Sequence, residues 1–275
     1  NLVANGIADP VTWAKIESII NSPYQNGNRH PDISEFKKKL VGLGYGAFSY
    51  TDLYADRTES AVRDFQRAYG LPVSGILDEI SIDVLETKYN ELFVKILIDA
   101  GHGGKDPGGM GFGLIEKDLV LDIATSTADY LNQNYRWVEV QLTRSTDKFI
   151  ELSDRAKMAN DWNADYFVSI HTNALNGTAH GFESFIYNGV VSNETRRLQR
   201  EVHSYIVNQM NVYDRGMKRA NFNVLRNSKV PAMLVEYLFI DNKSDNKLLS
   251  QASYRKWLGE ITAKAIAKSF NLTRK

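Results

Sequence analysis

The chain has 275 residues, 43% of them hydrophobic and 24% charged, which is typical of an ordinary globular protein with a substantial core. Its 33 basic and 33 acidic residues balance, which argues against nucleic acid or an anionic membrane as the main partner. The absence of cysteine excludes disulfides and thiolate metal sites, and no apolar run is long enough for a transmembrane helix.

The N-terminal residues repeat a later segment of the chain. Residues 1–17 and 70–86 align without a gap at these pairs: Leu2 and Leu71, Gly6 and Gly75, Ile7 and Ile76, Asp9 and Asp78, Ile16 and Leu85, Glu17 and Glu86. Each copy predicts a turn, a capping aspartate and a short amphipathic helix. Chance similarity of two capped helices is one interpretation. We favour the other, in which residues 1–22 are the tail of a truncated preceding repeat.

The complete copy, residues 30–90, predicts a small domain of three helices. Apolar residues recur at helical spacing along the first two helices: Ile33, Phe36, Leu40 and Leu43, then Ala61, Val62, Phe65 and Ala68. Asp56 or Thr58 is expected to cap the second helix and Gly70 to end it. The third helix follows Asp78.

Residues 58–75, TESAVRDFQRAYGLPVSG, resemble the three-helix peptidoglycan-binding module, whose usual pattern is T-x-x-A-V-x-x-F-Q-x-x-x-G-L-x-x-x-G. The matching residues are Thr58, Ala61, Val62, Phe65, Gln66, Gly70, Leu71 and Gly75. Most of these are core and cap positions, so the resemblance indicates the fold more strongly than ligand binding.

Residues 93–275 alternate between strand-like and helical patterns. Short apolar runs predict strands at 93–100, 138–143, 165–174, 181–188 and 232–239, and helical patterns lie at about 117–134, 150–160, 193–210 and 253–270. Residues 87–93 are the expected linker. We therefore predict an α/β catalytic domain with a mostly parallel, twisted central sheet flanked by helices, preceded by the small helical module.

The loop after the first strand, in LIDAGHGGKDPGG at 97–109, matches neither a phosphate-binding nor a dinucleotide-binding motif. His102 lies just past the carboxyl end of that strand, where α/β sheets place their sites, and His171 ends a second strand. The two histidines form a plausible metal pair, although each is alternatively a hydrogen-bonded histidine at the edge of the core. We expect His180 and His203 to be structural and His30 to be solvated.

Two glutamates complete the candidate site. A metal site without cysteine needs a further histidine or carboxylate, and Glu116 follows the glycine loop, although an acid at a helix N-terminus is also common. Glu236 lies within an apolar strand, where a buried acid needs a partner. It is either a general base beside activated water or a buried glutamate paired with arginine.

Eight motifs then occur in the order of the zinc-dependent N-acetylmuramoyl-L-alanine amidases, the cell-wall family often called amidase 3, which residues 95–270 closely resemble. They are ILIDAGHGGKDPG, GLIEKDLVLDIA, LTRSTD, LSDRAKMAN, FVSIHTNA, GFESF, RGMKRANFNVLR and PAMLVEYLFIDN. The resemblance implies that His102, Glu116 and His171 bind Zn²⁺ and that Glu236 is catalytic. Leu238 departs from the family, which commonly has glycine there, and is expected to narrow the site.

Several other polar residues have weaker expected roles. Asp99 is expected to orient His102 or to cap a turn. Asn173 and Arg226 are candidates for gripping substrate, and Arg144 and Arg155 are expected to form structural ion pairs.

The resemblance implies hydrolysis of the amide between N-acetylmuramic acid and L-alanine in peptidoglycan. We expect glycan strands and stem peptides as partners, no nucleic acid or membrane partner, a monomer, and a secreted, cell-wall-associated location, although the chain shows no signal peptide. The alternatives are a wall-binding protein with a silent or blocked hydrolase domain, and a zinc peptidase acting within the stem peptide. Ordinary helices and strands fill the chain between Glu116 and His171, leaving no room for an added lid.

Overall fold

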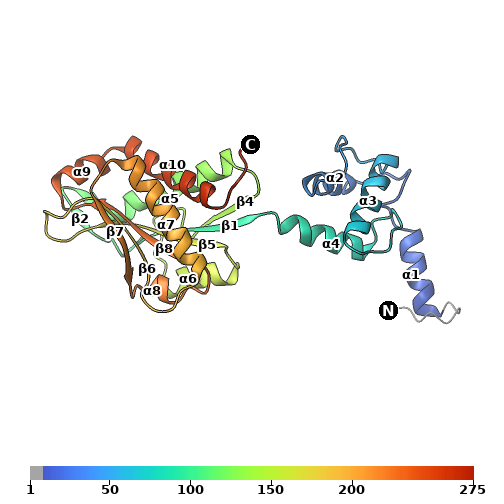
Figure 1. The fold of residues 1–275 in the computed structure, drawn as a ribbon, viewed down its shortest axis with the longest axis horizontal. Coiled ribbons are helices and arrows are strands. Elements are labelled where there is room, and N and C mark those ends of the chain that lie inside the picture. The colour runs from blue at the N-terminus through green and yellow to red at the C-terminus, as the bar shows by residue number, and fades with distance from the viewer. Residues whose placement is uncertain (1–8) are drawn as a thin grey trace. The chain divides into compact units, whose positions relative to one another are not determined.

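The computed structural model describes residues 9–275, apart from the side chain of Lys15, and divides into two units (Figure 1). The first unit runs to Phe93 and the second is Val94–Lys275. Residues 1–8, which carry part of the predicted repeat, lie outside the described residues. Within the described residues, no helix is both long and apolar enough to span a membrane.

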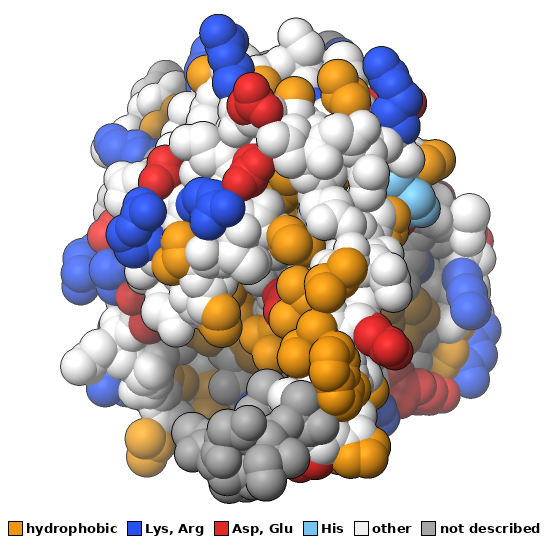
Figure 2. Space-filling view, turned by 90° about the vertical axis from the view of Figure 1, so that its right-hand side faces the viewer, with side chains coloured by type: hydrophobic (Ala, Val, Ile, Leu, Met, Phe, Trp, Pro, Cys, Tyr) orange, Lys and Arg blue, Asp and Glu red, His pale blue; other side chains and the backbone are white. Residues whose placement is uncertain are grey.

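The first unit is helical, with α1 at Pro10–Ile20, α2 at Ile33–Gly42, α3 at Asp56–Ala68 and α4 at Glu79–Asn90. Its buried core comprises Ile33, Phe36, Leu40, Tyr54, Val62, Phe65, Leu77 and Leu85. Helix α3 is preceded by Ala55 as N-cap, so neither expected capping residue is used, and Ala68 is exposed. Most of the expected linker is the last turn of α4. Figure 2 shows this unit's surface, where hydrophobic side chains gather among charged ones.

The second unit contains a six-stranded sheet of order β4-β1-β5-β8-β6-β7. Its strands are β1 at Val94–Ala100, β4 at Val138–Leu142, β5 at Tyr166–Asn173, β6 at Phe182–Tyr187, β7 at Asp214–Ala220 and β8 at Ala232–Phe239. Only the β6–β8 pairing among these is antiparallel, so the predicted mostly parallel sheet is confirmed. A separate hairpin pairs β2 at Met110–Gly111 with β3 at Leu114–Ile115.

Successive side chains of a strand point to opposite faces of the sheet. Because the central strands are buried along most of their length, both faces need cover, and helices lie on both (Figure 1). One face packs on α5 at Glu116–Asn134, α7 at Asn193–Met210 and α10 at Ala252–Ser269; Ile96 and Ile98 lie in this core. The other face packs on α6 at Leu152–Asp161 and α8 at Asn223–Arg226, with Leu97 in the second core. Helix α9, Lys243–Leu249, contacts β8.

Candidate metal centre

Three adjacent strands and the start of α5 bring the four predicted chemical residues to one edge of the sheet. His102 follows β1, His171 lies near the end of β5, and Glu236 on β8 is directly opposite His171 in the strand register. Glu116 is the first residue of α5, where the chain returns from the glycine loop. The carboxyl ends of parallel strands therefore place these residues together, as the sequence predicts.

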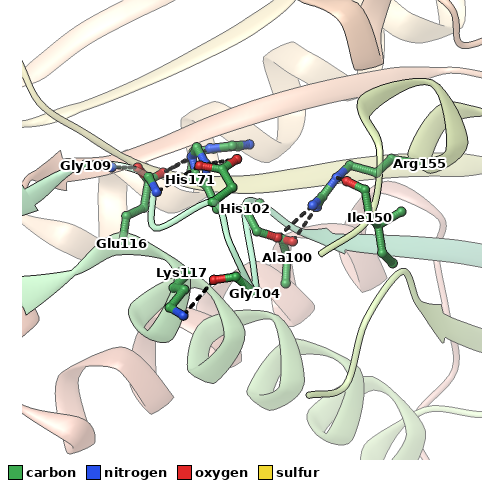
Figure 3. Close-up of polar contacts among 12 residues, drawn as sticks. Ala100, His102, Gly104, Gly109, Glu116, Lys117, Ile150, Arg155 and His171 are labelled. Atoms are coloured by element: carbon green, nitrogen blue, oxygen red, sulfur yellow. Dashed lines mark hydrogen bonds and ion pairs between the residues drawn. The ribbon is translucent and has the colours of Figure 1, made fainter. Parts of the chain in front are cut away.

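The ligating atoms of His102, Glu116 and His171 all lie within 4.8 Å of one another. Glu116 Oε1 is 3.2 Å from His102 Nε2 and 3.0 Å from His171 Nδ1 (Figure 3). Two ligands bonded at about 2.0–2.1 Å to a tetrahedral zinc lie about 3.3 Å apart, so this spacing and this set of two imidazoles and one carboxylate fit zinc.

Glycines allow the three candidate ligand side chains to lie close to the backbone of the loop. A Cβ atom at Gly101 would lie 2.3 Å from the His171 ring, and one at Gly108 would lie 2.6 Å from both Glu116 and His102. His102 itself has a left-handed backbone with φ of 57°. The glycine loop is thus required by the close approach of three side chains.

Backbone amides fix the Glu116 carboxylate. The amide of Gly109 donates to Oε2 at 2.7 Å, and that of Thr172 donates to Oε1 at 3.1 Å. Burial alone would raise the pKa of Glu116, but its contacts with both histidines outweigh this and hold the pKa well below its usual range. Burial likewise opposes charge on His102, yet Glu116 and Asp106 together raise its pKa.

The expected partner of His102 is corrected from Asp99 to Asp106. His102 Nδ1 is 2.9 Å from Asp106 Oδ2, which leaves Nε2 facing Glu116. Asp99 is fully buried and accepts hydrogen bonds from Thr143, Arg155 and Ser169 instead. Asp106 could have been found in the sequence as the carboxylate four residues after His102, on the far side of a tight glycine turn.

Glu236 lies beside the cluster with one oxygen unpartnered. Its Oε2 atom is buried and has no hydrogen-bond partner among the described residues. Burial raises its pKa well above the usual value, and the negative charges of Glu116 and Glu183 raise it further. The alternative of a glutamate paired with arginine is not what the structure shows.

A cavity of about 380 Å³ opens over the cluster, and His102, Glu116, His171 and Glu236 all line it. Asn173 also lines the cavity, held by a 2.7 Å bond from its amide nitrogen to Glu183. Arg226 does not line it: this exposed side chain bonds Asn221. The preceding Phe222 and Asn223 line the cavity instead, and no charge or periodicity in the sequence singled them out.

Leu238 does not narrow the site as expected. Its side chain is fully buried in the larger core rather than among the cavity-lining residues. The two arginines differ in role: Arg155 pairs with Asp99 at 2.8 Å as expected, whereas Arg144 donates to four backbone carbonyls.

The fold and the site define a class, an α/β domain that presents a His–Glu–His cluster and an unpaired glutamate at the carboxyl edge of a parallel sheet. The sequence matches the N-acetylmuramoyl-L-alanine amidase family over residues 96–268 and a peptidoglycan binding domain over residues 29–85. The chain therefore belongs to the N-acetylmuramoyl-L-alanine amidase family.

Individual relatives agree. The sporulation-specific N-acetylmuramoyl-L-alanine amidase of Bacillus subtilis is 44% identical over 181 residues, covering 66% of this chain and 70% of the relative. The endolysin of Bacillus phage SPP1 is 44% identical over 184 residues, covering 66% and 67%. The crystal structure of an N-acetylmuramoyl-L-alanine amidase from Clostridium difficile 630 is similar with a TM-score of 0.62 and 35% identity, covering 65% of this chain and 97% of that one.

Proposed function

We propose that this protein hydrolyses the amide bond between N-acetylmuramic acid and the L-alanine of the stem peptide in peptidoglycan, with zinc as its cofactor. The observation that carries the proposal is the preformed cluster of His102, Glu116 and His171 beside Glu236, within a chain that belongs to the amidase family.

His102 Nε2, Glu116 Oε1 and His171 Nδ1 are the proposed zinc ligands. Zinc held there would lower the pKa of its water to about 7 and polarise the substrate carbonyl. Asp106 fixes the ring orientation of His102, and the Gly109 and Thr172 amides fix Glu116. These contacts favour a site that is ordered before substrate arrives.

Glu236 is the proposed general base and acid. Its unpartnered, buried oxygen and raised pKa suit a carboxyl that exchanges a proton during the reaction. The carboxylate accepts a proton from the attacking water and then donates it to the departing amine of alanine. Asn173 lies at the cavity wall, where its side chain is placed to contact substrate.

The test is digestion of purified peptidoglycan with mass identification of the products. The wild-type protein should release sugar-free stem peptides that begin with L-alanine, and a chelator should stop this. Glu236→Gln should still bind zinc but release these peptides at least about 100-fold more slowly, whereas Glu139→Gln, at an exposed position of β4, should act like the wild type.

Other outcomes would contradict the proposal. Fragments cut within the stem peptide would indicate a zinc peptidase, and no cleavage by zinc-loaded protein would indicate a silent or blocked domain. Near-normal release by Glu236→Gln would remove the proposed role of that residue.

The N-terminal unit, residues 30–90, is the proposed wall-targeting module, and residues 93–275 the catalytic domain of a monomer that acts at the cell wall outside the cell. The match to a peptidoglycan binding domain supports this role. Residues 1–22 are proposed to derive from a preceding repeat. In support, Asp9 and Asp78 each accept a bond from the amide three residues later, at 2.7 and 2.9 Å, and so cap α1 and α4 in the same way.

A further inference from the structure

Two buried arginines converge on the turn that carries His102. Arg144, just after β4, is 3% exposed, and Arg155, in α6, is 1% exposed. Between them they bond three successive carbonyl oxygens, those of Ala100, Gly101 and His102, at distances of 2.6–3.0 Å. Figure 3 shows the guanidinium of Arg155 directed at the end of β1.

Each arginine also ties this turn to another part of the site. Arg144 donates a 2.7 Å hydrogen bond to the carbonyl of Lys117, and Lys117 follows Glu116 at the start of α5. Arg155 pairs with Asp99 and donates to the carbonyl of Ile150 at 3.0 Å. The arginines thereby fix His102 relative to Glu116 and to the neighbouring strands.

The turn needs such support because its backbone is unfavourable. His102 has φ of 57° and Gly103 has φ of 122°, and a non-glycine residue in the left-handed region is strained. Hydrogen bonds from a charged donor are stronger than neutral ones, and the planar guanidinium bonds several acceptors in a fixed geometry that lysine cannot reproduce.

We propose that Arg144 and Arg155, together called the arginine clamp, are positioning residues that hold His102 in its ligating conformation before any metal binds. The clamp bonds backbone carbonyls rather than the proposed ligand atoms, and Arg155 also lies in the wall of the cavity over the cluster. It acts through the backbone carbonyls of the turn, so its loss should weaken metal binding rather than alter the ligand set. This inference rests on the proposed role of His102 as a zinc ligand.

The test measures the zinc affinity of the full chain by competition with a chromophoric chelator. Arg144→Lys and Arg155→Lys keep the positive charge but lose the planar fork, and each should bind zinc about 10–100-fold more weakly. The matched control is Arg197→Lys. Arg197 makes a comparable set of bonds, to Glu194, Glu201 and the carbonyl of Ser269, and this variant should bind zinc as tightly as the wild type.

Unchanged zinc affinity in folded Arg144→Lys and Arg155→Lys would overturn the clamp, while zinc retention by His102→Ala would instead overturn the ligand assignment. A second measurement uses only the wild type and so applies even if the lysine variants do not fold. The amides of Gly101, Gly103 and Gly104 should be equally protected from hydrogen exchange with and without zinc. Loss of their protection on zinc removal would contradict the proposal.

Discussion

At the residue scale, Leu238 shows how backbone geometry constrains a position near the site. It has φ of 65°, and the pairing of β5 with β8 shifts there, so that His171 opposes Glu236 but Asn173 opposes Phe239. The extra residue of β8 forms a bulge directly after Glu236. Glycine, which the resembled family commonly has here, adopts this backbone without strain; leucine adopts it while filling the core.

The first prediction concerns Leu238→Gly, where two effects oppose each other. Glycine would relieve about 1–2 kcal/mol of left-handed strain, but loss of a fully buried leucine side chain costs about 2–5 kcal/mol and glycine adds backbone entropy to the unfolded chain. We expect the free energy of unfolding to fall by about 1–4 kcal/mol in denaturant titrations. An increase in stability would mean that strain outweighs packing at this position.

Strand ends and residue types mark the four chemical residues as candidates, and the resemblance to the amidase family then selects them from the alternatives. His102, Glu116, His171 and Glu236 each follow or lie within a recognisable element. The arginine clamp could not be predicted, because its role depends on hydrogen bonds that join segments far apart in the sequence. Such bonds leave no periodic pattern in the chain.

At the scale of elements, the strands buried on both faces were predictable and the charged edge strand was not. The runs that form β1, β5 and β8 are almost continuously apolar, whereas β7 reads DRGMKRA and lies at the end of the sheet with partly exposed side chains. An edge strand needs less burial and carries charge, so its sequence lacks the usual strand pattern.

Helix α7 is joined to this edge of the sheet by a buried histidine. His203 Nδ1 is 2.8 Å from Ser184 Oγ on β6, and its Nε2 is 3.0 Å from Asp214 Oδ1 at the start of β7. Burial lowers the pKa of His203, and the nearby Asp214 only partly opposes this. The folded state therefore favours neutral His203.

The second prediction follows from that lowered pKa. In the unfolded chain a histidine has a pKa of about 6.5. As the pH falls below this value, the unfolded state takes up a proton that the folded state resists. The free energy of unfolding therefore decreases towards acid pH, and this contribution is fully present only above the pKa of the unfolded state. Between pH 7.5 and 5.5 the unfolding free energy should fall more steeply for the wild type than for His203→Gln. Parallel pH profiles would contradict this.

At the scale of the whole molecule, the chain divides into two units with separate cores. The solved amidase structure from Clostridium difficile 630 aligns with 65% of this chain across 97% of its own length. That crystallised chain is therefore about as long as the second unit alone. The first unit has its own match to a peptidoglycan binding domain. The change in the sequence from helical patterns to alternating strand and helix patterns near residue 93 falls at the boundary between these two units.

The last prediction separates the proposed amide hydrolysis from the proposed binding to cell walls. Residues 94–275 alone should fold, bind zinc as tightly as the full chain and cleave a small soluble muramoyl peptide at an unchanged rate, because every proposed site residue lies in this unit. Binding to insoluble walls should weaken, because the truncated protein lacks the helical unit. In the full chain, binding of one unit to the wall holds the other nearby at an effective concentration of up to about the millimolar range. Sedimentation with purified walls measures the binding, and product release from the soluble peptide measures the chemistry. A truncated protein that sediments as well as the full chain would show that the helical unit contributes nothing to wall binding, and slower cleavage of the soluble peptide would show that the catalytic unit depends on it.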